Sequence, residues 1–279
     1  MINYSNNHKN LITFKQLNQV QNYFTNSLTS VYRNNRGRSP LLSTIDICSI
    51  LYIQSIFQIL TLKSLYNLLK QFYNDFYKLP SYQNFVLNIN KQTKHLPLFL
   101  TKDKSKIKII DSTPLEVCKI QREKRHKIMK SISTKTNNGM RWYYGLKMHI
   151  LIEPQGSIID IKITTASTND SKLHSIFIPK YPNTIYIADK GYLSKDNRRL
   201  AGVYNSSIFT PIRKNMTSTE LTKDEVKSYS RIRKMVETTF SILKTRYNLV
   251  STLPRSINGY LSHYIRSVFM YQLKFVFNS

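Results

Sequence analysis

The sequence is poor in glycine and cysteine, and each shortage excludes a class of site. Seven glycines in 279 residues leave no glycine-rich loop to hold phosphates, so we expect no nucleotide cofactor. The only two cysteines, Cys48 and Cys118, have no CxxC partner. This excludes a disulfide framework and a cysteine-rich zinc site. Free cysteines are also typical of a reducing compartment, which predicts a cytoplasmic protein.

Long apolar runs are also missing. The two most apolar stretches, 45–60 and 260–277, are interrupted by polar residues such as Asp46 and Arg266. The first ten residues are polar and lack the apolar run of a signal peptide. We therefore predict a soluble protein with no membrane partner.

Acidic residues are scarce, and basic residues are not. Lys and Arg total 42 against 15 Asp and Glu, which gives a formal net charge of +27. Such an imbalance costs self-repulsion, so it predicts a polyanionic partner. Nucleic acid is the first choice, because neutralised phosphates release counterions, and a membrane surface is the second. The alternative is a genome-wide bias toward lysine codons.

The chain is expected to have three parts. Residues 1–40 are polar and basic and predict an arm or loop. Residues 41–103 show helical spacing, with Ser64 and Ser81 as expected helix starts, and predict a small all-α domain for DNA binding or dimerisation. Residues 104–279 mix both periodicities and predict an α/β domain, the expected location of any catalytic site.

The third part alternates strand and helix patterns. Strands are expected at 107–110, 146–153, 158–163, 184–188 and 208–212, and helices at 168–177, 194–200, 220–247 and 259–277. Pro154-Gln155-Gly156 predicts a tight turn between the second and third strands. Three meandering strands followed by alternating helices and strands is the order of the ribonuclease H-like α/β fold, a mixed sheet flanked by helices.

Three acids occupy positions suited to catalysis. Asp111 follows the apolar run 107–110, and Asp189 follows 185–188. Sites of open α/β sheets collect at the carboxyl ends of strands, so these carboxylates should meet at one edge. Glu237 lies on the long helix beside the apolar stripe of Val236 and Phe240. The alternatives are a turn or cap role for each Asp and a surface ion pair for Glu237.

Three neighbouring carboxylates suit metal-dependent cleavage of a phosphodiester bond. Cleavage of a phosphodiester needs an activated water and a stabilised leaving oxygen, which two divalent ions about 4 Å apart supply. Mg²⁺ prefers hard oxygen ligands. The three acids are therefore expected to be both catalytic residues and metal ligands.

Several blocks of the sequence resemble, in order, those of bacterial insertion-sequence DDE transposases, nearest the 982-type group. They are Asp111–Pro114, Tyr144–His149, Ala188–Tyr192, Thr210–Asn215 and Arg233-x3-Glu237-x6-Lys244, with Arg36–Pro40 and Ser81–Asn90 upstream. The resemblance implies a triad of Asp111, Asp189 and Glu237 with two Mg²⁺ or Mn²⁺ ions. It also implies DNA contacts by Lys190, Arg233, Lys244, Arg36 and Arg38. The family's pattern has a tyrosine at a fixed spacing before the arginine that precedes the glutamate. Here Tyr229 is one position off that spacing from Arg233.

The resemblance also implies a function. Such an enzyme cleaves double-stranded DNA at the terminal inverted repeats of its element and joins the freed 3′-hydroxyl to target DNA. Two ends must be held together, so we expect a homodimer in the synaptic complex, associated with the bacterial nucleoid when bound to DNA. The alternatives are a catalytically inactive transposase-derived repressor and a ribonuclease H-like nuclease without joining activity.

Overall fold

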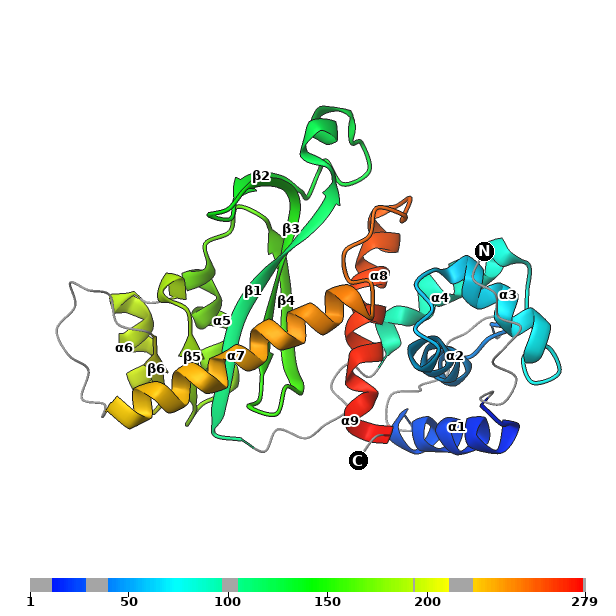
Figure 1. The fold of residues 1–279 in the computed structure, drawn as a ribbon, viewed down its shortest axis with the longest axis horizontal. Coiled ribbons are helices and arrows are strands. Elements are labelled where there is room, and N and C mark those ends of the chain that lie inside the picture. Colours follow the sequence, from blue (N-terminus) through cyan, green and yellow to red (C-terminus); the bar gives the residue numbers. More distant parts are fainter. Residues whose placement is uncertain (1–11, 29–39, 97–104, 193, 211–222, 278–279) are drawn as a thin grey trace.

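A computed structural model describes residues 12–28, 40–96, 105–192, 194–210 and 223–277 of the chain (Figure 1). In this part of the chain, no helix is both long enough and apolar enough to cross a membrane.

The N-terminal part is helical. It contains α1 (Phe14–Leu28), α2 (Thr44–Ile56), α3 (Leu62–Phe72) and α4 (Tyr82–Gln92), followed by the short 3-10 turn η3 (Thr93–His95). Buried residues such as Leu17, Ile50, Leu65 and Phe85 form one core between these helices. Ser81 caps α4 as expected, because its hydroxyl accepts a hydrogen bond from the backbone N–H of Asn84.

Two details differ from the sequence-based expectations. The arm expected over 1–40 contains α1, whose buried Val20 and Phe24 pack in the helical core despite the polar composition of the segment. The cap of α3 is Thr61 rather than Ser64, and the Thr61 side chain accepts from the backbone N–H of Ser64. The helix therefore begins one turn earlier than predicted.

The rest of the chain forms a mixed sheet with helices. Its strands are β1 (Ile107–Cys118), β2 (Thr134–Asn137), β3 (Trp142–Ile152), β4 (Ile158–Thr165), β5 (Ile185–Ala188) and β6 (Ser207–Phe209). β1 is central, antiparallel to β3 on one side and parallel to β5 on the other, and β6 extends the parallel side. The predicted β3–β4 hairpin is present. The short edge strand β2 was not expected.

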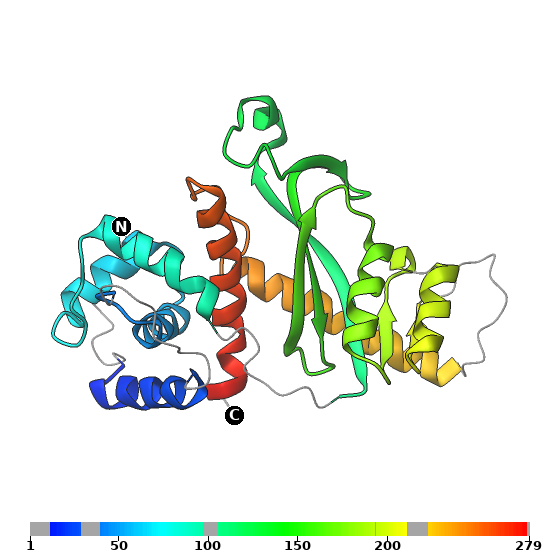
Figure 2. The ribbon, with the colours of Figure 1, turned by 180° about the vertical axis from the view of Figure 1, so that it is seen from behind.

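Helices cover both faces of the sheet (Figures 1 and 2). On one face lie α7 (Lys223–Thr245) and α8 (Ile257–Gln272), and α9 (Lys274–Phe277) follows α8. On the other face, α5 (His174–Lys180) and α6 (Lys195–Val203) pack over Ile110, Tyr186 and Ala188. Three 3-10 turns complete this part: η4 (Ile120–Arg125), η5 (Asp170–Leu173) and η6 (Lys190–Tyr192).

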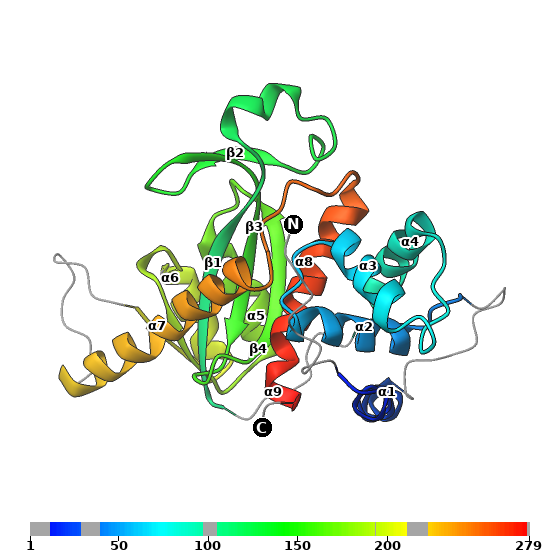
Figure 3. The same cartoon turned by 45° about the vertical axis from the view of Figure 1, so that its right-hand side comes forward.

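α8 belongs to two hydrophobic cores at once. Its residues Tyr264 and Val268 pack in the core beneath the sheet, whereas Phe269 and Met270 pack among the N-terminal helices. Figure 3 shows α8 between the sheet and the helices α2 to α4. The helical part therefore shares its core with α8, which follows the sheet in the sequence.

Candidate active site

The register of β1 and β5 places two acids side by side. The two strands run parallel, and their last paired residues are Ile110 and Ala188. Asp111 is the next residue of β1 and Asp189 directly follows β5, so both lie at the carboxyl end of this ladder. Neighbouring strands lie about 4.8 Å apart, so both carboxylates start from adjacent backbone positions.

One expectation about this edge is corrected. β1 does not end before Asp111 but continues to Cys118, paired with β3 alone. Only the pairing with β5 ends at Ile110, so beyond that point one edge of β1 has no strand beside it among the described residues. Pro114 lies in this half-paired stretch, where a strand tolerates a missing N–H.

Asp111 is held in a partly buried position. The backbone N–H of Ser112 donates a hydrogen bond of 2.8 Å to its Oδ1. Burial raises the pKa of Asp111 to about 6. The Ser112 hydrogen bond and the positive charge of Arg233 oppose this rise, whereas the negative charges of Asp189 and Asp170 add to it. Asp111 is thus surrounded by the other charged groups of the site.

Glu237 is brought to the same edge by α7, which packs on β1 and β5. Val236, Phe240 and Leu243 of α7 are buried against the sheet, as their spacing predicts. Glu237 is next to this stripe with 60% of its side chain exposed. The helix therefore presents a carboxylate to solvent at the margin of its packed face.

Arg233 connects the helix to the sheet. Its Nη1 lies 3.4 Å from Oε1 of Glu237, and its Nη2 lies 3.6 Å from Oδ1 of Asp189. The Arg233 side chain is only 23% exposed, whereas that of Asp189 is 51% exposed. One guanidinium thus faces two members of the predicted triad and acts electrostatically on the third, Asp111.

The donor set suits a hard divalent cation, because all three side chains are carboxylates. Within the described ranges, however, no three His, Cys, Asp or Glu side chains are gathered closely enough to hold an ion. The positive charge beside Asp189 and Glu237 is that of Arg233. Metal binding by the triad would therefore require the carboxylates to close around the ion and the guanidinium to move aside.

A fourth acid, Asp170, was missed by the sequence analysis. Its Oδ2 accepts from the Ser112 hydroxyl at 3.2 Å, and its Oδ1 accepts from Lys147 Nζ at 3.0 Å. His149 lies 3.8 Å away but is fully buried, and burial lowers its pKa to about 4. The pattern Asn169-Asp170 predicts a helix start, which hid this second role.

Of the remaining predicted residues, the side chains of Lys244 and Tyr229 lie in the described part of the chain. Lys244 is exposed on α7, seven positions after Glu237. Lys190 begins η6, but its side chain lies outside the described part, as do Arg36 and Arg38 entirely. The Tyr229 ring packs 4.8 Å from that of Phe209, which gives it a contact between α7 and β6.

Comparison with solved structures gives distant matches, among them three transposase complexes. A piggyBac transposase synaptic complex with hairpin DNA matches at a TM-score of 0.47 and 10% identity over 93% of this chain and 72% of that chain. Mos1 transposase in a paired-end complex with left transposon end has a TM-score of 0.26, with 12% identity over 83% and 86% of the two chains. A pre-cleavage Mos1 transpososome has a TM-score of 0.27, with 10% identity over 95% and 88%.

A search of curated proteins found no match. The sequence pattern of the family described as "Transposase DDE domain" matches residues 101–257, which is more than half of the chain. This stretch includes Asp111 within β1, Asp189 directly after β5, and the part of α7 with Glu237. The chain therefore belongs to the DDE-domain transposase family.

Proposed function

We propose that this transposase cleaves and joins DNA at a site formed by Asp111, Asp189 and Glu237 in a ribonuclease H-like domain. The observation that carries the proposal is the β1–β5 register: the pairing of the two strands ends at Ile110 and Ala188, and an acid follows directly in each chain segment. α7 adds Glu237 to that edge through the Arg233 bridge. The Arg233 contacts to Asp189 and Glu237, and the position of Asp111 beside Asp189, support a shared site for these three acids.

The proposed cofactor is a pair of Mg²⁺ or Mn²⁺ ions held by the three carboxylates. Bound ions would activate the attacking oxygen and stabilise the leaving oxygen of the phosphodiester. The protein's own residues prepare the site. The backbone N–H of Ser112 donates to the Asp111 carboxylate and orients it, and Arg233 offsets the mutual repulsion of the acids until substrate arrives.

The proposed substrate is double-stranded DNA. A net charge of +27 favours binding to phosphates over most of the surface. Arg233 and the exposed Lys244 lie on the α7 face that carries Glu237, where they would contact the strand being cut. Lys190, Arg36 and Arg38 are further proposed DNA contacts. We propose that the DNA ends are terminal inverted repeats of a 982-type insertion sequence, held by a homodimer.

The test is a cleavage and joining assay on DNA that carries the inverted repeats flanking the gene. We expect the wild-type chain to nick these ends in Mg²⁺ and to form strand-transfer joints. Asp111→Asn, Asp189→Asn and Glu237→Gln should each reduce nicking by at least a hundredfold while DNA binding in EDTA is kept. Asp75→Asn is the matched control, because Asp75 is exposed in the turn after α3.

Two outcomes would contradict the proposal. Nicking by Asp111→Asn or Asp189→Asn at the wild-type rate would remove these residues from the active site. Tight binding of the repeats by the wild-type chain without cleavage in Mg²⁺ or Mn²⁺ would instead indicate a repressor. Cleavage without joints would indicate a nuclease only.

A further inference from the structure

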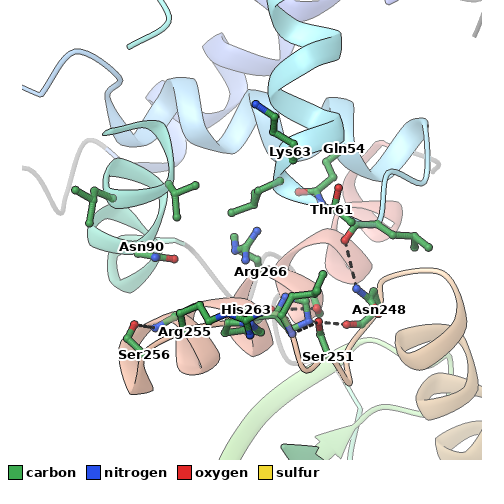
Figure 4. Close-up of a pocket in the computed structure, with 18 of the residues that line it drawn as sticks. Gln54, Thr61, Lys63, Asn90, Asn248, Ser251, Arg255, Ser256, His263 and Arg266 are labelled. Atoms are coloured by element: carbon green, nitrogen blue, oxygen red, sulfur yellow. Dashed lines mark hydrogen bonds between the residues drawn. The ribbon is translucent and has the colours of Figure 1, made fainter. Parts of the chain in front are cut away.

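A cavity of about 870 Å³ lies between the N-terminal helices and the C-terminal part of the chain, away from the triad. Its walls come from α3 and α4 on one side and from α8 and the segment before it on the other (Figure 4). Volumes of roughly 300–1,000 Å³ are typical of pockets that hold small ligands. This cavity is therefore large enough for one.

Arg266 of α8 is the most unusual residue of the cavity wall. Its side chain is 6% exposed, yet its Nε has no hydrogen-bond partner, and no acid of the described residues pairs with it. Burial lowers the pKa of Arg266 to about 10, so the guanidinium stays charged at neutral pH. A buried charge without a counterion is costly, and a bound anion would remove that cost.

The charges around the cavity have one sign. Lys63 of α3 and Arg255 before α8 line it with Arg266, and none of its described lining residues is acidic. Lys63 Nζ also lies 4.5 Å from the ring centroid of Tyr82. Several cations around one space suit a phosphate better than a singly charged carboxylate.

A second buried polar group of the cavity, the side-chain oxygen of Gln54, also lacks a hydrogen-bond partner. Gln54 is 4% exposed, and its Nε2 donates to the carbonyl of Ile59, but its Oε1 is buried without a partner. It would accept a hydrogen bond from an N–H donor. Tyr82 and Tyr247 add aromatic surface to the same walls. The cavity thus combines an unpaired cation, an unpaired acceptor and aromatic faces.

We propose that this cavity binds one nucleotide, with its phosphate on Arg266 and its base between the tyrosines near Gln54. The nucleotide could come from a free nucleoside monophosphate or from an unpaired position of a DNA strand, because both offer a phosphate, a flat ring and an N–H donor. The site is separate from the triad and needs no metal, so it goes beyond the proposed function.

The first experiment titrates the full chain in EDTA with deoxyadenosine monophosphate, deoxyadenosine or inorganic phosphate. We expect the monophosphate to bind at least tenfold more tightly than either fragment. Arg266→Met should weaken that binding at least tenfold and should leave the melting temperature unchanged or raised, because it removes an unpaired buried charge. Lys63→Met should weaken binding severalfold, and Lys70→Met, exposed on the same helix outside the cavity, should not.

The second experiment uses a duplex with one bulged 2-aminopurine nucleotide. Fluorescence that changes on binding and is reversed by the free monophosphate would identify a DNA strand as the source. Binding of the monophosphate without that change would identify a free nucleotide. Equal affinity of Arg266→Met for the monophosphate, or a clear destabilisation of that variant, would overturn the proposal. Asp111→Asn should bind normally, so failure of catalysis and failure of this site are distinguishable.

Discussion

Asp111→Asn should stabilise the metal-free protein at neutral pH. Burial raises the pKa of Asp111 from its ordinary value of 3.8 to about 6. A tenfold change in proton affinity corresponds to about 1.4 kcal/mol, so the ionised carboxylate costs the folded state about 3 kcal/mol. Asparagine keeps the shape of the side chain without this charge. The variant should therefore gain up to about 3 kcal/mol in free energy of unfolding near pH 7.5.

The size of the stability gain depends on pH. Between pH 3.8 and about 6, the folded chain holds a proton on Asp111 that the unfolded chain has released, so wild-type stability falls as pH rises through this window. At the lower end of this window, near pH 4, the folded chain holds Asp111 neutral and no longer carries the cost of its charge, so the gain should shrink to under about 1 kcal/mol. Urea unfolding in EDTA near pH 4 and pH 7.5 measures both values.

The matched control is Asp75→Asn, which removes an exposed carboxylate and should change stability little at either pH. The reasoning is refuted if Asp111→Asn is no more stable than wild type at pH 7.5, or if its gain is as large at pH 4. The first result would mean that the Asp111 carboxylate is not penalised by burial. The second would mean that the gain comes from packing and not from charge.

Three further variants test the fold and the surroundings of the site. Gly145→Ala should cost about 1–3 kcal/mol in urea unfolding, because its Cβ would lie 2.1 Å from the Leu115 carbonyl oxygen; wild-type stability would contradict the β1–β3 approach. Thr61→Ala should cost about 1 kcal/mol by removing the α3 cap, with Thr61→Ser restoring most of it. Asp170→Asn should cost about 2 kcal/mol, because Lys147 keeps its charge and loses its partner; the absence of any loss on chemical denaturation would show that this ion pair is not stabilising.

The elements with strong local signals could be predicted from the sequence. The Pro154-Gln155-Gly156 turn joins β3 to β4, and the apolar run before Asp189 is the buried strand β5. The long helix α7 also followed from its buried stripe. In each case a period or a turn signal within a few residues determines the structure.

The features that could not be predicted from the sequence depend on partners far away in the chain. β1 continues past Asp111 because β3 pairs with it, which the proline in this stretch concealed. Asp170 matters through Ser112 and Lys147, and Arg266 through a cavity whose opposite wall is α3 and α4. The local spacing of residues does not predict such long-range contacts. In the sequence, Asp170 and Arg266 therefore look like ordinary polar residues.

The shared helix α8 bears on how the chain folds during its synthesis. The N-terminal helices end at Gln92, but the residues that complete their core, such as Phe269, are made only after α8 begins at Ile257. At about 5–20 residues per second, the ribosome needs roughly ten to thirty seconds to cover that gap. During that interval the nascent helices expose the apolar surface that α8 later covers. We expect chaperones to bind this surface.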